Sequence, residues 1–269
     1  MLTPPILSNK HYADPSVFTA ENLLREARRQ KALTLARVPT ICVLDPDGDI
    51  VRWLVGTKRA KRHPQWACYH TDLYAFEHDG IQFGILGCAV GASFAVLVAE
   101  ELFASGCELL VSVTSAGQVV AVAEPPYFIL IEKALRDEGT SYHYLPPADF
   151  SHISPGVLSA VGGGLATAPM PVHRGATWTT DAPFRETAPA LAHCHELGIM
   201  AVEMEAAALY AFAEAKNKSV ICLAHVTNRM AQAEGDFEKG IEGGSQDALQ
   251  MVAVVARAWL SSRRQPQER

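Results

Sequence analysis

Two carboxylates, Glu203 and Glu205, lie two residues apart in the stretch AVEMEAAALYAFAEA, where an apolar strand-like run passes into a helical run. The helix dipole favours anions at a helix N-terminus, so a charged first turn is the simplest interpretation of this pair. However, the helical run carries no further charge until Glu214, which predicts that the helix is buried. Acids at the head of a buried helix need a ligand or a polar partner. The pair is therefore a candidate site.

Polar residues also follow three other apolar runs. In VSVTSAGQV, Ser112, Thr114 and Ser115 lead into a turn at Gly117. The run TICVL is followed by DPDGDIVR, and SVICLAHV is followed by TNRM. Because ligands of open α/β sheets bind at the carboxyl ends of the strands, these strand ends are where the sequence predicts chemistry.

Strand and helix patterns alternate along the chain and position these residues. We expect helices over 20–36, 93–106 and 245–262, strands over 40–44, 82–86, 108–113 and 219–226, and a strand feeding a helix over 198–217. The run 127–139 is expected to contain a further helix, and the Pro- and Gly-rich region 145–176 is interpreted as a linker-like segment. The alternation predicts an α/β fold, a single-domain three-layer sandwich with a twisted, mostly parallel mixed sheet flanked by helices. The domain is expected to span 1–269, with an N-terminal helical extension at 1–38 and a frayed tail at 263–269.

Composition excludes several classes of protein. A formal net charge of -6 argues against a general nucleic-acid coat. The six cysteines are scattered and form no CxxC pair, which indicates a reduced, cytoplasmic protein. The N-terminus lacks a signal pattern, and the apolar run 81–99 is interrupted by three glycines, so a buried strand and helix explain it better than a membrane span. The histidines His193 and His195 face different sides of a helix, and no metal site is expected.

The stretch Glu203-Met204-Glu205 is similar to the E-M-E motif of the nucleoside phosphorylase superfamily, which includes uridine phosphorylases, hexameric purine nucleoside phosphorylases and methylthioadenosine/adenosylhomocysteine nucleosidases. The resemblance covers about residues 40 to 260, as motifs in the family's order. It implies a ribose site formed by Glu203, Met204 and Glu205, in which Glu205 binds the 2′- and 3′-hydroxyls and Met204 packs against the sugar. A carboxylate that fixes the ribose would act by positioning.

The stretch LDPDGDIVRWL resembles the family's phosphate loop, G-D-P-x-R, with matches at Gly48, Asp49 and Arg52 and with Ile50 where Pro is usual. Together with the hydroxyl of Ser115, the resemblance implies phosphate binding by Gly48, Arg52 and Ser115. The alternative for this stretch is a D-G hairpin turn followed by a surface arginine.

Ser112 stands where uridine phosphorylases carry a main phosphate-binding arginine. In addition, TSAG resembles the GSAG of the nucleosidases, which use water. A replacement cation could come from a neighbouring subunit or from the run TKRAKRH, which contains Lys58, Arg59, Lys61 and Arg62. Such a run is more commonly a solvated basic face.

Two further stretches resemble base-recognition segments. GATWTTDAPFRET implies that Thr179 and Phe184 line the base, although an ordered surface loop is the alternative. HVTNRM carries Asn228 and Arg229, as uridine phosphorylases do, where purine enzymes place an aspartic acid. An asparagine cannot act as a general acid, whereas an arginine can stabilise the charge on a departing pyrimidine.

The resemblance implies a pentosyltransferase that cleaves a pyrimidine-leaning, uridine-like nucleoside by phosphorolysis to a free base and ribose 1-phosphate. Glu205 and Arg229 would be its catalytic residues, and inorganic phosphate would be a co-substrate, with no cofactor. Two alternatives are a nucleoside hydrolase that uses water, motivated by Ser112, and a catalytically silent nucleoside-binding protein. We expect a homo-oligomer, a hexamer or a dimer, with no nucleic-acid or membrane partner.

Overall fold

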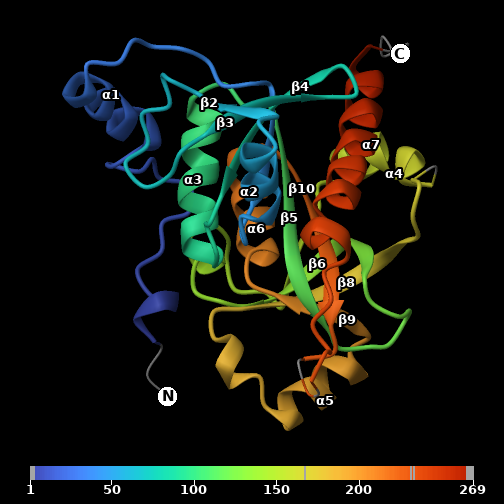
Figure 1. Cartoon of the computed structure of the whole chain (residues 1–269). Coiled ribbons are helices and arrows are strands. Elements are labelled where there is room, and N and C mark those ends of the chain that lie inside the picture. The colour runs from blue at the N-terminus through green and yellow to red at the C-terminus, as the bar shows by residue number, and fades with distance from the viewer. Residues whose placement is uncertain (1–3, 167, 231, 233, 265–269) are drawn as a thin grey trace.

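A ten-stranded sheet forms the centre of the computed structural model, which describes residues 4–166, 168–230, 232 and 234–264 (Figure 1). The strands are β1 (Ile41–Asp45), β2 (Ala60–Arg62), β3 (Tyr74–His78), β4 (Ile81–Gly87), β5 (Leu109–Gln118), β6 (Tyr127–Asp137), β7 (Phe150–His152), β8 (Val172–Thr180), β9 (Ile199–Glu203) and β10 (Ser219–Asn228). The helices are α1 (Ala20–Lys31), α2 (Asp49–Gly56), α3 (Ala92–Ala104), α4 (Pro155–Leu165), α5 (Ala188–Glu196), α6 (Ala206–Lys216) and α7 (Ser245–Arg264). Short 3-10 turns are η1 (Pro5–Leu7), η2 (Ser141–His143), η3 (Pro183–Arg185) and η4 (Ile241–Gly244).

The sheet is mixed, and part of it closes on itself. Its order is β10-β6-β8-β9-β5-β1-β4-β3-β2, β7 pairs with β6, and β10 also pairs with β5. The strands β5, β10, β6, β8 and β9 therefore form a closed circuit. Parallel pairing joins β5 to β1 and β10, whereas β2, β3 and β7 are added by antiparallel pairing.

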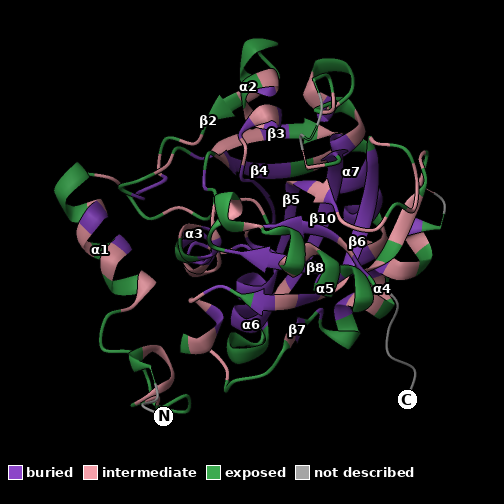
Figure 2. Cartoon of the chain, turned by 90° about the horizontal axis from the view of Figure 1, so that it is seen from below, coloured by how far each residue is buried: buried purple, intermediate pink, exposed green. Residues whose placement is uncertain are grey.

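Helices cover both faces of the sheet, which confirms the expected α/β class. Helix α3 packs on α6 and α1, and helix α7 packs on α2 and α4 (Figure 1). Figure 2 shows that the buried residues are concentrated in β5, β10, α6 and α7, where the core lies. Along α6, the residues Ala206–Ala213 are all buried, as the absence of charge predicted. No helix within the described part of the chain combines the length and apolarity that a membrane span requires.

Two predictions about local structure are wrong. The run 127–139 forms the long strand β6, with no helix, because five consecutive bulky apolar residues are buried between β8 and β10, and strand pairing outweighs helical spacing. The region expected to be a linker contains β7, α4 and the start of β8. A helix that was not predicted, α2, begins directly after the turn at Gly48. In the expected frayed tail, residues 263 and 264 still belong to α7, and residues 265–269 lie outside the described residues.

Tyr210 ties helix α6 to the sheet. Its buried hydroxyl donates to the carbonyl of Ile131 in β6 at 2.5 Å and accepts from the amide of Cys222 in β10 at 3.1 Å. A Tyr210→Phe substitution leaves both backbone groups buried without this partner, so we expect it to lower the free energy of unfolding by about 1–3 kcal/mol. Urea denaturation measures the change. A loss below a few tenths of a kcal/mol would show that the bridge contributes nothing to stability.

Candidate functional site

The strand ends that the sequence singled out lie together in the structure. The Asp45–Gly48 turn follows β1, and the carboxylate Oδ2 of Asp47 accepts from the amide of Ser115 in β5 at 3.1 Å. The next residue back along β5, Thr114, donates from its hydroxyl to the carboxylate of Glu205 at 2.8 Å. The parallel register of β1, β5 and β10 brings these ends to one edge of the sheet.

Both carboxylate oxygens of Glu203 accept hydrogen bonds from neighbouring residues of the chain. Its Oε2 accepts from the amides of Glu205 and Ala206, both at 2.7 Å, and so caps the start of α6. Its Oε1 accepts from the hydroxyls of Thr177 at 3.0 Å and Thr179 at 2.5 Å. Burial raises the pKa of this carboxyl, and the four hydrogen bonds partly oppose that rise.

Thr179, which the sequence assigned to the base, is fully buried in this network. Its hydroxyl also accepts from the amide of Ala207 at 2.9 Å. Phe184, the predicted stacking partner of the base, lies in η3 and is 99% exposed. The structure therefore brings neither side chain to the Thr114–Glu205 pair.

Glu205 is held by two donors from separate elements. The amide of Gly91, just before α3, donates to Oε1 at 2.8 Å, and Thr114 donates to Oε2. The side chain is only 1% exposed. Burial, followed by the neighbouring charge of Glu203, raises its pKa to about 8. Each carboxylate oxygen accepts one bond and keeps further capacity, as a pair of sugar hydroxyls requires. Met204, between the two glutamates, is half-buried.

A small cavity of about 20 Å³ lies beside the Thr114–Glu205 pair, and Thr114 belongs to its lining. Its polar lining consists of the carboxylates of Asp45, Asp47 and Asp49, together with Thr114, Ser115 and His225. His225 stacks on the ring of Phe128 with 4.5 Å between the ring centroids. Burial, followed by the charge of Lys239, lowers the pKa of His225 to about 4, so the ring is neutral near pH 7.

Lys239, which was not predicted from the sequence, pairs with two of the acidic residues that line this cavity. Its ammonium lies 2.5 Å from Oδ2 of Asp49 and 3.7 Å from Oδ2 of Asp47. Lys239 belongs to a segment that turns back over the site after β10, where the amide of Glu238 donates to the carbonyl of Thr227 at 2.8 Å. The only sequence signal was a lysine followed by glycine in GDFEKG, downstream of a polar strand end.

The predicted phosphate ligands have other partners. Gly48 is the N-cap residue that precedes α2, with a φ of 78°, and its amide donates to Oδ1 of Asp45 at 3.2 Å. Arg52 lies within α2 and donates to Oδ1 of Asp49 at 2.6 Å and to the carbonyl of Asp47 at 2.8 Å. Ser112 is buried, and its hydroxyl has no hydrogen-bond partner among the described residues.

The basic run TKRAKRH lies elsewhere. Arg62 pairs with Asp72 at 2.6 Å, and the guanidinium of Arg59 stacks over the ring of Trp53. Lys61 belongs to β2, the edge strand at the far end of the sheet order, and Lys58 follows the C-terminal end of α2. Within the described part of this chain, the run therefore provides no cation for the cavity.

A second cavity of about 600 Å³ lies further along β5 and β10. Gln118 of β5 and Thr227 of β10 form its inner wall, and Arg229 lines it as well. The guanidinium of Arg229 pairs with the carboxylate of Glu124. The amide of Asn228 is also engaged, since its nitrogen donates to the hydroxyl of Thr227 at 3.1 Å and its oxygen accepts from the amide of Met230 at 2.8 Å.

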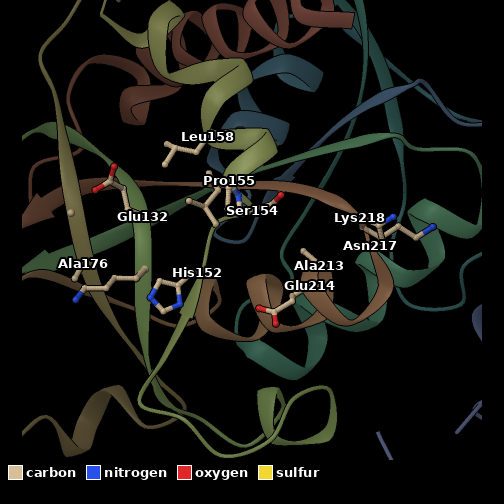
Figure 3. A pocket seen from close by; sticks show the side chains of 13 residues that line it. Glu132, His152, Ser154, Pro155, Leu158, Ala176, Ala213, Glu214, Asn217 and Lys218 are labelled. Carbon is tan, nitrogen blue, oxygen red and sulfur yellow. The ribbon is translucent and has the colours of Figure 1, made fainter. Parts of the chain in front are cut away.

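Another cavity, of about 690 Å³, lies at the opposite end of α6 (Figure 3). Figure 3 shows Glu214 of α6 and His152 of β7 along one side of it and Pro155 at the start of α4 along the other. None of the predicted site residues lines it.

Asp45 makes the stability of the fold depend on pH. Burial raises its pKa from 3.8 to about 7, although the amides of Val51 and Gly48 donate to it. Because the folded state holds this proton more tightly than the unfolded chain does, the contribution of Asp45 to stability is full below about pH 4 and is lost as the pH rises to about 7. An Asp45→Asn variant should lack that loss, which is at most roughly 4 kcal/mol. Urea titrations of both proteins between pH 4 and 8 test this, and parallel pH profiles would contradict it.

Comparisons with known proteins agree with this architecture. The family model of the phosphorylase superfamily matches residues 18–260. Among solved structures, a uridine phosphorylase from Vibrio fischeri ES114 superposes with a TM-score of 0.68 at 18% identity, over 93% of this chain and 99% of that one. The same enzyme complexed with 6-hydroxy-1-naphthoic acid gives a TM-score of 0.62 at 18% identity, over 87% and 91%.

A purine nucleoside phosphorylase from Toxoplasma gondii, in complex with immucillin-H, gives a TM-score of 0.70 at 15% identity, over 86% of this chain and 93% of that one. No curated protein matches the sequence of this chain. At these identities the structural likeness establishes the fold, and the family model covers most of the sequence. The chain belongs to the phosphorylase superfamily.

Proposed function

We propose that the protein cleaves the N-glycosidic bond of a nucleoside with water as the nucleophile. The observation that carries this proposal is the cavity of about 20 Å³ beside the Thr114–Glu205 pair. A cavity of this size holds about one water molecule, which needs two to four polar partners. Asp47, Ser115 and His225 offer such partners in its wall.

The charge around the cavity also favours water over phosphate. Three carboxylates line it, and the cations nearest to them, Lys239 and Arg52, are already paired with Asp49. The amide of Ser115, which a phosphate oxygen could use, already donates to Asp47. A bound phosphate dianion would have to displace that carboxylate and would meet the remaining negative charge at short range.

The chain's own groups suit the steps of hydrolysis. Glu205 fixes the ribose through hydrogen bonds with its hydroxyls, and this positions the sugar between the water and the base as oxocarbenium character develops. Asp47 uses one oxygen to accept from Ser115, and its other oxygen is available to take a proton from the water. Neutral His225 offers a second hydrogen-bonding group to that water.

Phosphorolysis is the second candidate function, and two observations favour it. The superposed structures include a uridine phosphorylase and a purine nucleoside phosphorylase, and Lys239 supplies one cation at the nucleophile side of the ribose. In this reaction Lys239 and Arg52 would have to exchange Asp49 for phosphate. The preference for uridine depends on Arg229 leaving Glu124 to face the base.

One assay separates the two reactions. The purified chain is incubated with a panel of nucleosides in phosphate-free buffer and again with inorganic phosphate, and sugar products are separated by chromatography. Hydrolysis predicts free ribose at the same rate in both buffers. Ribose 1-phosphate formed only in the presence of phosphate would replace hydrolysis with phosphorolysis, and no cleavage in either buffer would reject both.

A further inference from the structure

The second cavity carries an unusual charge for a site that holds a base. Its lining contains four carboxylates and one guanidinium; the carboxylates belong to Glu124, Glu234, Asp236 and Glu238. The guanidinium of Arg229 is paired with Glu124, so it contributes little free positive charge. The formal charge of the lining is therefore -3. Such a wall attracts a cation and repels the anion that a departing pyrimidine would become.

Position connects this cavity with the ribose site. Ser115 and His225 line the cavity of about 20 Å³, and Gln118 and Thr227 line the second cavity further along the same two paired strands. Between the two cavities lies Gly117, where a Cβ atom would stand 2.6 Å from Sδ of Met230 and 3.3 Å from Oδ1 of Asn228. A nucleoside with its ribose at Glu205 therefore extends its base along β5 and β10 toward the acidic wall.

Gln118 adds a separate feature that points to a ligand. The side chain is 8% exposed, and its amide nitrogen donates to the carbonyl of Ala123 at 2.7 Å and to the hydroxyl of Tyr127 at 3.0 Å. These bonds fix the orientation of the amide. The carbonyl oxygen accepts no bond from the described residues, and Gln118 belongs to the lining of the cavity. It is a free acceptor on a largely buried residue and suits an N–H donor on a ligand.

The two residues at the end of β10, Asn228 and Arg229, offer little help to a neutral base in leaving. Asn228 stands at the end of β10, and an amide is not a general acid. Arg229 is neutralised by Glu124. A base that already carries a fixed positive charge needs neither group. When its C1′–N bond breaks, the electron pair returns to the ring nitrogen, and the base leaves neutral.

We propose that the substrate is a nucleoside with a cationic base, an N-ribosyl pyridinium or a similarly quaternised ring, that also carries an N–H donor. This inference rests on the proposed function. The water oxygen forms the new bond to C1′, the C1′–N pair neutralises the ring, and the water proton passes to Asp47. The acidic wall binds the positive charge before the bond breaks, and Gln118 accepts from the donor.

A test by binding does not depend on catalysis. 1-Methylnicotinamide, which is methylated on the ring nitrogen, is a pyridinium cation without a glycosidic bond to cleave. Nicotinamide is its neutral counterpart with the same carboxamide. Calorimetry on the full chain is expected to give an affinity for the cation at least tenfold higher than for nicotinamide, with a gap that narrows as salt rises. Equal affinities, or tighter binding of nicotinamide, would overturn the inference.

Variants locate the effect. Glu234→Gln and Glu238→Gln should each weaken binding of 1-methylnicotinamide by about 1.5- to 5-fold, since each removes one exposed charge. The affinity for nicotinamide should not change. Glu196→Gln, an exposed acid at the end of α5, is the matched control and should change neither affinity. An equal loss in the control, or unchanged affinities in both variants, would show that the wall does not select the cation.

Cleavage assays then separate this inference from the proposed function. N-ribosylnicotinamide and uridine are compared, each rate divided by its uncatalysed rate in the same buffer. The inference expects the cation to show the larger acceleration, by at least tenfold. Larger acceleration for uridine would overturn the inference and leave the proposed function intact. Selective binding of the cation with no cleavage of any nucleoside would overturn the proposed function alone.

Discussion

A Glu205→Gln variant should lose nucleoside cleavage by about 10²- to 10³-fold in kcat/KM, the effect of removing one preorganised electrostatic group. The amide keeps the shape of the side chain but replaces one carboxyl oxygen, an acceptor for a ribose hydroxyl, with an NH2 group that only donates. It can also no longer accept from both Gly91 and Thr114 with its two terminal atoms. The measurement is steady-state kinetics on the nucleoside that the wild-type protein cleaves fastest.

Two controls make this result specific to the ribose site. Glu214→Gln changes an exposed acid on the same helix and should leave kcat/KM unchanged. The wild type should also prefer a ribonucleoside over its 2′,3′-dideoxy analogue, and the Glu205→Gln variant should lose that preference. If the variant retained both its rate and the preference for the ribonucleoside, the assignment of Glu205 to the ribose would be wrong.

The second large effect is expected from Asp47→Ala, which should lower kcat by about 10²- to 10⁴-fold, as loss of a general base does. Added formate should restore part of the activity, because it can occupy the place of the missing carboxylate near the amide of Ser115. The wild-type protein should show no such stimulation. Rates are followed in phosphate-free buffer, with free ribose as the product.

Asp72→Asn is the control for this experiment, since Asp72 pairs with Arg62 and lies outside the cavity. Its rate should equal that of the wild type. An Asp47→Ala protein that is folded by circular dichroism and fully active would falsify the role of Asp47 as the base. Stimulation of the wild type by formate would show that the salt acts elsewhere.

The sequence was informative where neighbouring strands align their ends. The stretches containing Asp47, Ser115 and Glu205 were each recognisable as polar residues after an apolar run. Parallel pairing of β1 with β5 placed Asp47 beside Ser115, whereas Glu205 reaches Thr114 from just after β9, which pairs with β5 in antiparallel orientation. The strand β6 was mistaken for a helix because its burial between β8 and β10 is decided by partners far along the chain.

The roles of individual side chains depended on tertiary contacts that spacing does not encode. Thr179 was expected to face the base, yet its hydroxyl lies within hydrogen-bonding distance of Glu203, 24 residues away in sequence. The basic run at 57–63 was the obvious source of a cation, but the strand that carries Lys61 lies at the sheet edge. Lys239 reaches Asp49 because the segment after β10 folds back.

The contact between Lys239 and Asp49 spans 190 residues, and this separation sets an order of events during synthesis. The ribosome releases the turn after β1 long before it releases the lysine that neutralises that turn. Until then, Asp45, Asp47 and Asp49 lie close together without Lys239, and Arg52, which pairs with Asp49, is the cation that the same segment supplies. The contact between Lys239 and Asp49 is therefore completed late, when nearly all of the chain has left the ribosome.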